Sequence, residues 1–201
     1  MVLVGVVGGT GGCGVPLINY LLEKGYSVRM LARTPEKVTQ IDNKEVTVIK
    51  GDALNEEDIA EVCQDVDLVI SCAGGGPGAQ IMEKLASNIV KAKPKRCYFI
   101  TSLGMGGSSM TINLLLGFFL GRQKILDYEK ADALMLKNNY TVVRPCHLKG
   151  EPVGDYCATS DTGMSSKAIS KTDVALFLLN CVENQEWDGM PVQLYNAACK
   201  K

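Results

Sequence analysis

The glycine-rich segment from Gly8 to Gly14 is the pattern in this chain that is best suited to binding chemistry. It contains both G-x-G-x-x-G and G-x-x-G-x-x-G and follows an apolar run directly. Glycines permit a tight turn, and without Cβ atoms they let a pyrophosphate approach backbone N–H donors at the start of a helix. The segment lacks the Lys-Ser/Thr pair of P-loop NTPases. The spacing therefore predicts a dinucleotide-binding loop, rather than a turn without a ligand, with contacts from Gly8, Thr10, Gly11, Gly12 and Cys13.

An arginine ends the second predicted strand, where NAD-preferring sites usually carry an acidic residue that binds the ribose 2'-hydroxyl. Arg33 instead offers a guanidinium that can pair with a 2'-phosphate and stack beside the adenine, with Thr34 and Lys37 as weaker contacts. We therefore expect NADP(H) as the cofactor. The alternative is that Arg33 is an ordinary solvated loop residue. Arg29 lies within the strand, and we expect it to be structural.

Short apolar runs rich in β-branched residues alternate with longer segments of helical period along the chain. Parallel strands need crossover connections, usually helices, so this alternation predicts a parallel sheet between two helical layers. The predicted strands cover residues 2–7, 27–31, 46–49, 68–71, 97–101, 140–143 and 192–195. The predicted helices cover residues 13–24, 56–63, 79–91, a long region that ends near 138, and 170–180. We expect one doubly wound α/β domain, a Rossmann fold with three α/β/α layers, over residues 1–201.

Composition and charge exclude several classes of partner. The chain has 201 residues, 46% of them hydrophobic, and a formal net charge of -1, so it can form one full core and has no overall field to attract nucleic acid.

Its longest apolar run, 110–120, is shorter than the roughly 20 residues that span a bilayer, and its N-terminus lacks the basic region of a signal peptide. We expect a cytoplasmic protein without a membrane span, either a monomer or a homodimer. A single histidine, His147, and the lack of any C-x-x-C pair predict reduced cysteines and no metal site.

Further motifs follow the glycine loop in a fixed order. They are Arg33, Gly51-Asp52-Ala53, Thr101-Ser102 and Val142-Val143-Arg144-Pro145. In this order the chain resembles the atypical short-chain dehydrogenase/reductases. Among the compact members it is similar to the NmrA-like proteins and to the biliverdin IX-beta reductase (flavin reductase) type of NAD(P)-binding protein. The resemblance covers nearly the whole chain.

The resemblance implies contacts with the adenosine half of the cofactor. Asp52 would meet the adenine amino group, with Ala53 beside it. The segment Cys72-Ala73-Gly74, after the fourth predicted strand, would pass beside the adenosine ribose. At this position Cys72 fits a small packing residue better than a reactive thiol.

The resemblance also implies that residues after the fifth and sixth strands lie near the nicotinamide, at the carboxyl edge of the sheet where ligands bind. These residues are Thr101, Ser102, Pro145, Cys146 and His147. Ser102 is the first catalytic candidate, and the alternative is a serine that only hydrogen-bonds the following turn. His147 either donates a proton near neutral pH or contacts the cofactor or the substrate without chemistry.

The chain departs from the family at the Tyr-x-x-x-Lys pair, in which the lysine lowers the pKa of a catalytic tyrosine. Its only Tyr-x-x-x-Lys, Tyr20 with Lys24, lies on the helix after the glycine loop. The helix after Ser102 carries the reverse order, Lys124 and Tyr128, at the same spacing. Tyr128 is therefore a catalytic candidate, with an exposed or packing tyrosine as the alternative.

The expected activity is NADPH-dependent hydride transfer to a planar conjugated acceptor of the flavin, quinone or bilin type. We expect residues 103–125 and 146–170 to form the substrate pocket. Within them, the apolar stretch 114–120 is a helix start, a lid, a subunit contact or part of the core. Residues 149–166 are expected to form a surface loop. The alternative is a non-catalytic NADP(H)-binding redox sensor or scaffold, because the tyrosine–lysine dyad is missing. A nucleotide-sugar epimerase is disfavoured, since a chain this short leaves little room for the larger substrate region of those relatives.

Overall fold

The computed structural model describes residues 2–74, 79–102, 122–160 and 167–196. These residues form an eight-stranded sheet in the order β3-β2-β1-β4-β5-β6-β10-β8 and a separate pair, β7-β9. The strands of the sheet are β1 (Leu3–Val7), β2 (Ser27–Ala32), β3 (Val46–Lys50), β4 (Leu68–Ser71), β5 (Cys97–Ile100), β6 (Thr141–Pro145), β8 (Cys157–Thr159) and β10 (Pro191–Tyr195). The short pair joins β7 (His147–Leu148) to β9 (Ala168–Ile169).

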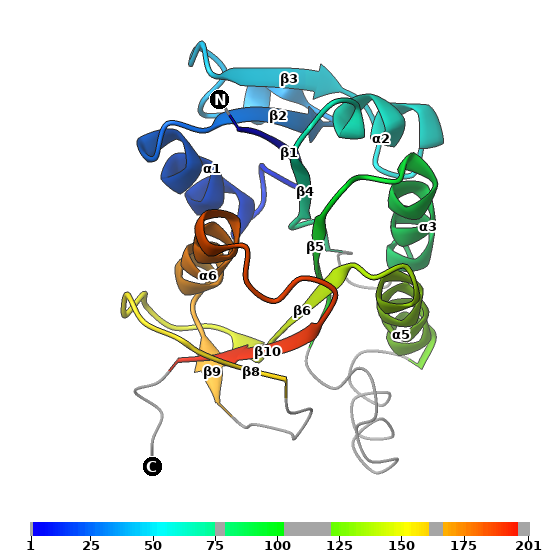
Figure 1. The fold of residues 1–201 in the computed structure, drawn as a ribbon, viewed down its shortest axis with the longest axis vertical. Helices are drawn as coiled ribbons and strands as arrows, with labels where there is room; N and C mark the ends of the chain where they lie inside the picture. Colours follow the sequence, from blue (N-terminus) through cyan, green and yellow to red (C-terminus); the bar gives the residue numbers. More distant parts are fainter. Residues whose placement is uncertain (1, 75–78, 103–121, 161–166, 197–201) are drawn as a thin grey trace.

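Helices cover both faces of the sheet (Figure 1). They are α1 (Gly14–Glu23), α2 (Glu56–Cys63), α3 (Met82–Ala92), α5 (Arg122–Lys137) and α6 (Lys171–Asn184), with a short 3-10 turn at Pro35–Lys37. Leu17 of α1 and Phe177 of α6 lie in one buried cluster, and Ile59, Leu85 and Met135 of α2, α3 and α5 lie in the other. Two apolar clusters separated by one sheet confirm the predicted three-layer Rossmann fold. Within the described ranges, no helix has the length and apolar character needed to cross a bilayer.

The first strand, β1, lies inside the sheet, and the order in which the chain adds strands reverses between β1 and β4. From β1 it moves outward through β2 to β3, and it then returns to β4 on the other side of β1. Val7 pairs with Leu31 of β2 and with Ser71 of β4, so the three strands end at the same edge. Ligands of open α/β sheets bind at such a reversal of strand order. The residues that follow these three strands therefore meet at one place.

The start of α3 depends on a contact that is remote in sequence. The Asp127 carboxylate, on α5, accepts the backbone N–H groups of Met82 and Glu83, each at 2.9 Å. These are N–H groups that a helix cannot satisfy internally. Because the cap comes from another helix, α3 begins at Met82 rather than at the predicted Ala79.

Asp127→Ala is expected to lower the free energy of unfolding by about 2 kcal/mol, because one buried and one partly buried N–H group lose their acceptor. Urea-induced unfolding followed by circular dichroism measures this change. A suitable comparison is Asn55→Ala, which removes a single exposed cap hydrogen bond to the Asp58 N–H at 3.0 Å and is expected to cost about 1 kcal/mol. A smaller loss for Asp127→Ala than for Asn55→Ala would contradict the assigned role of Asp127.

The sheet contains one strand that the sequence does not predict. β8 pairs in antiparallel direction with β10, within the segment expected to be a surface loop. Its three residues, Cys157 to Thr159, are all half-buried, and the flanking Gly, Ser, Thr and Asp residues are typical of loops. A strand this short at a sheet edge has no hydrophobic period to detect. The surface loop predicted at 149–166 is therefore wrong at Cys157–Thr159, while the sheet is parallel apart from this edge strand. Residues 161–166 of the same predicted loop lie outside the described residues.

Candidate functional site

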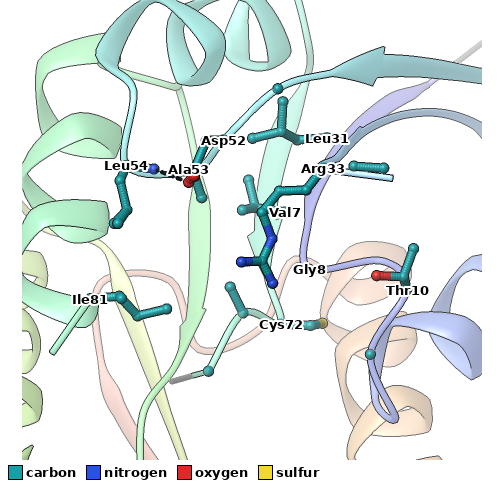
Figure 2. Close-up of a pocket in the computed structure, with 15 residues that line it drawn as sticks. Val7, Gly8, Thr10, Leu31, Arg33, Asp52, Ala53, Leu54, Cys72 and Ile81 are labelled. Atoms are coloured by element: carbon teal, nitrogen blue, oxygen red, sulfur yellow. Dashed lines mark hydrogen bonds between the residues drawn. The ribbon is translucent and has the colours of Figure 1, made fainter. Parts of the chain in front are cut away.

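A cleft of about 240 Å³ opens at the carboxyl ends of β1, β2 and β4 (Figure 2). Its walls come from the glycine loop, the end of β2, the loop after β3 and the segment after β4. The lining residues are Val7, Gly8, Thr10, Gly11, Leu31, Ala32, Arg33, Gly51, Asp52, Ala53, Leu54, Cys72, Ala73, Gly74 and Ile81. Nine of the residues predicted to bind the cofactor are thus brought together in one cleft: Gly8, Thr10, Gly11, Arg33, Asp52, Ala53, Cys72, Ala73 and Gly74.

The glycine loop is packed so closely that two of its glycines have no room for a side chain. Gly8 has a φ of +81°, and a Cβ there would lie 2.5 Å from the backbone nitrogen of Ala73. A Cβ at Gly14 would overlap the carbonyl oxygen of Gly8. The turn itself is closed by the Gly11 N–H, which donates to the Gly8 carbonyl at 3.0 Å. The loop therefore depends on glycine at both ends for its shape.

Arg33 follows β2 and is exposed. Its side chain extends into the cleft, with the guanidinium directed between the glycine loop and Ile81 (Figure 2). Arg29, in contrast, donates to the carbonyl oxygens of Glu61 and Gln64 at the end of α2. The two arginines have the positions predicted for them, one at the cleft and one within the scaffold.

The loop after β3 is fixed by hydrogen bonds from two helices. The Asp52 N–H donates to the Asp58 carboxylate at 2.7 Å, and Asn88 donates from its Nδ2 to the Ala53 carbonyl at 3.2 Å. Asp52 itself accepts the Leu54 N–H on Oδ1 at 2.9 Å, the interaction drawn in Figure 2. One oxygen of Asp52 thus shapes the loop that lines the cleft.

Sequence reasoning missed the apolar part of the cleft. Leu54 and Ile81 line it on the side opposite Arg33 (Figure 2), and Val7 and Leu31 also belong to the lining. Leu54 is 38% exposed, and an apolar side chain left open to solvent beside a cleft offers a flat base a surface to pack on. An exposed leucine has no signature in spacing, so only the fold could reveal it.

Burial raises the pKa of the two thiols near the glycine loop. Cys13 is buried beneath the loop, outside the lining of the cleft, and burial raises its pKa to about 11. Cys72 lines the cleft, packs against the buried core, and has its pKa raised well above the ordinary value by burial. A thiol with a raised pKa stays protonated at neutral pH. The prediction that Cys72 is a packing residue agrees with this environment.

The residues expected near the nicotinamide lie outside the described cleft, at the ends of β5 and β6. These strands are adjacent, with Ile100 paired to Val143. The Thr101 hydroxyl is buried and donates to Asp132 Oδ1 at 3.1 Å. Ser102 is half-buried and precedes residues 103–121, which lie outside the described residues together with the apolar stretch 114–120. The described cleft is therefore the part of this edge at the ends of β1, β2 and β4.

The turn after β6 presents one polar side chain to solvent. Pro145 ends β6, and the buried Cys146 donates its N–H to the Leu194 carbonyl at 2.8 Å. His147 follows at the start of β7 and is exposed. The turn is thus fixed by the sheet, and its histidine remains accessible.

Asp132 and Arg144 form a buried ion pair between α5 and β6. Arg144 Nη2 lies 2.6 Å from Asp132 Oδ2, and its Nε donates to Asp132 Oδ1 at 2.9 Å. Only 5% of the arginine side chain and 2% of the aspartate side chain are exposed. Thr101 completes this network, so one carboxylate fixes the ends of both β5 and β6.

Lys124 and Tyr128 share a face of α5, as their spacing predicts. The Lys124 ammonium lies 6.0 Å from the centre of the Tyr128 ring, and a Cβ at Gly74 would lie 3.6 Å from the Tyr128 hydroxyl. That hydroxyl therefore borders the segment that lines the cleft after β4. The other pair is remote from this region, since Tyr20 packs against the core and Lys24 pairs with Glu183 at 3.1 Å.

Residues 8–185 match the protein family described as NAD(P)H-binding. The chain belongs to this family. The match covers the glycine loop and the elements that follow it around the cleft, and it confirms that the sequence resemblance is to NAD(P)-binding proteins. The cofactor class is therefore NAD(P)(H).

Solved structures of other proteins share the fold. A Rossmann-fold NAD(P)-binding family protein from Shigella flexneri is 23% identical, covers 98% of this chain and 94% of its own, and has a TM-score of 0.79. ChuY, an anaerobillin reductase from Escherichia coli O157:H7, is 21% identical over 100% of both chains, with a TM-score of 0.80. A short-chain dehydrogenase/reductase from Veillonella parvula, solved in complex with NADP, is 16% identical, covers 100% of this chain and 97% of its own, and has a TM-score of 0.80.

Proposed function

We propose that this protein is an NADPH-dependent oxidoreductase of the atypical short-chain dehydrogenase/reductase type. Its substrate is a planar conjugated acceptor of the flavin, quinone or bilin class. The observation that carries the proposal is the convergence of the glycine loop, Arg33 and the Asp52 loop in one cleft where the strand order reverses. A Rossmann sheet binds a dinucleotide across this crevice.

The chain's residues divide the work of binding. The backbone N–H groups at Gly12 and at the start of α1 hold the pyrophosphate, because an anion is stabilised by the donors and the dipole of a helix N-terminus. Arg33 pairs with the 2'-phosphate, and Leu54 with Ile81 provides an apolar surface for the adenine. The nicotinamide end then extends toward Ser102 and His147, and the bound cofactor supplies a hydride there.

A planar acceptor suits the absence of the tyrosine–lysine dyad in its usual order. Such an acceptor takes two electrons as hydride and gains its proton from solvent, so it needs little local acid strength. Ser102 and His147 orient the acceptor or pass on that proton, and the Tyr128 hydroxyl beside Gly74 is a third candidate. The description of ChuY as an anaerobillin reductase and the NADP bound to the Veillonella protein support the acceptor class and the cofactor.

We further propose that residues 1–201 act as one cytoplasmic domain, as a monomer or homodimer without a nucleic-acid partner. Support for one domain comes from α1 and α6, which lie side by side although they are far apart in the sequence (Figure 1). The substrate region proposed at 103–125 and 146–170 includes the exposed His147 and Leu148 among the described residues.

Steady-state NADPH oxidation against a panel of flavins, quinones and bilins tests the proposal, with cofactor affinity measured on the same sample. Turnover above the rate without enzyme is expected for at least one acceptor class. Ser102→Ala and His147→Ala are expected to lower kcat while leaving the cofactor Kd unchanged. Saturating NADPH binding without turnover on any acceptor would instead support the redox sensor or scaffold.

Arg33→Ala is expected to raise the Kd for NADPH by about 10- to 100-fold, since a charge-assisted pair with phosphate contributes about 1.5–3 kcal/mol. The Kd for NADH should change little, because NADH lacks the 2'-phosphate. Titration of both cofactors followed by fluorescence measures the two constants. Arg33→Lys keeps the charge without the planar fork and should fall between the wild type and Arg33→Ala. An unchanged ratio of the two Kd values in Arg33→Ala would refute the role of Arg33.

A further inference from the structure

Lys171, the first residue of α6, lies directly over the glycine loop. A Cβ added to Gly12 would stand 2.5 Å from Lys171 Cδ and 3.1 Å from its Nζ. Because Gly12 has no side chain, the side chain of Lys171 can lie against the loop at this position. Neither the motif nor its spacing signals this contact, because Lys171 is distant in the sequence.

The backbone that carries Lys171 is held in place from three directions. Ser170 caps α6 by accepting the Asp173 N–H at 2.9 Å, and its own N–H donates to Asn196 at 3.1 Å. The Asp173 carboxylate accepts the N–H groups of Val153 and Gly154 at 3.1 and 3.0 Å. The α6 helix also packs beside α1 (Figure 1). The lysine thus begins from a fixed point beside the loop.

The charge of Lys171 is available to a ligand. Lys171 is exposed, and in the part of the chain that the structure describes no carboxylate forms an ion pair with it. The acid closest to it in sequence, Asp173, accepts a further hydrogen bond from Asn196 at 2.8 Å and is buried. The positive charge of Lys171 acts on the Cys13 thiol in the loop. Burial raises the pKa of that thiol, and the charge of Lys171 lowers it.

We propose that Lys171 is a phosphate-binding residue whose ammonium pairs with the pyrophosphate held by the glycine loop. The pyrophosphate would then lie between the N–H groups of α1 and the lysine of α6. This inference rests on the proposed function only in requiring that the cleft binds a dinucleotide. Under this proposal the two cationic side chains bind different groups of the cofactor. Lys171 contacts the pyrophosphate, which NAD and NADP share, and Arg33 contacts the 2'-phosphate, which NADP alone carries.

Calorimetric titration of Lys171→Gln with NADP+, NAD+ and adenosine 2'-monophosphate tests the proposal. The Kd values of both dinucleotides are expected to rise by the same factor, about 5- to 30-fold, because one charge-assisted contact is lost. The Kd of adenosine 2'-monophosphate, which has no pyrophosphate, should stay the same. Lys171→Arg should restore most of the affinity. Lys95→Gln, which removes an exposed lysine remote from the loop, should match the wild type.

The outcomes separate this inference from the proposed function. A wild-type protein that binds neither dinucleotide would overturn both. Normal wild-type binding with an unchanged Kd in Lys171→Gln would overturn only the role of Lys171. A weaker affinity for NADP+ with an unchanged affinity for NAD+ would place the lysine at the 2'-phosphate and would also overturn the inference. Equal melting temperatures of wild type and variant show that the fold is not the cause of any change.

Discussion

Asp132→Ala is expected to lower the free energy of unfolding by about 3–5 kcal/mol, a large share of the stability of a domain. The substitution leaves Arg144 charged and buried without its partner, and it removes the acceptor of the Thr101 hydroxyl. A buried charge without a counter-ion has lost its hydration, and no ion pair offsets that cost. Because the same carboxylate fixes the ends of β5 and β6, turnover should fall as well.

Urea-induced unfolding of Asp132→Ala and Lys130→Ala provides the comparison. Lys130, on the same helix as Asp132, pairs with Glu83 of α3 at 2.9 Å, but 60% of its side chain is exposed. An exposed ion pair contributes about 0–1 kcal/mol, so its removal should be close to neutral. A loss of less than about 1 kcal/mol for Asp132→Ala would mean that the buried pair does not hold this region. Asp132→Asn, which keeps a hydrogen-bond acceptor, should lie between the two.

Gly8→Ala is expected to weaken dinucleotide binding by more than about 100-fold, because the new Cβ cannot fit without moving the glycine loop away from Ala73. Gly25→Ala separates this effect from backbone strain. Gly25 has a φ of +79°, close to the +81° of Gly8, but a Cβ there meets nothing within 4 Å. Both variants should lose about 1–2 kcal/mol of stability from the left-handed backbone.

Fluorescence titration with NADPH and thermal unfolding of both variants measure the two effects. Only Gly8→Ala should lose the cofactor, while Gly25→Ala should bind like the wild type. Equal affinities in the two variants would show that the close approach of Gly8 and Ala73 does not shape the binding loop.

Local signals in the sequence predict most of the scaffold. The periods of the apolar runs locate the strands and helices, and α2 and β4 have the predicted bounds, Glu56–Cys63 and Leu68–Ser71. α6 begins at Lys171, one residue from the predicted start. The glycine spacing and Arg33 locate one half of the cleft, because these residues follow strands that end at the same edge.

Interactions between distant segments could not be predicted. The cap that Asp127 gives to α3, the pair of Asp132 with Arg144 and the reach of Lys171 to Gly12 each join residues from different elements. Their side-chain types alone allow many partners, and only the packing of the helices selects one. The edge strand β8 was missed for a different reason, since its pairing comes from β10 and not from its own composition.

Hydride transfer in a single turnover tests the central claim most directly. NADPH deuterated at either face of nicotinamide C4 is mixed with excess enzyme and the acceptor that the panel favours, and the mass of the NADP+ product is measured. We expect deuterium to leave from one face only, since a fixed cleft presents one face of the ring to the acceptor. Formation of NADP+ no faster than without enzyme, while NADPH is bound at saturation, would contradict a reductase and leave a protein that binds the cofactor without using it.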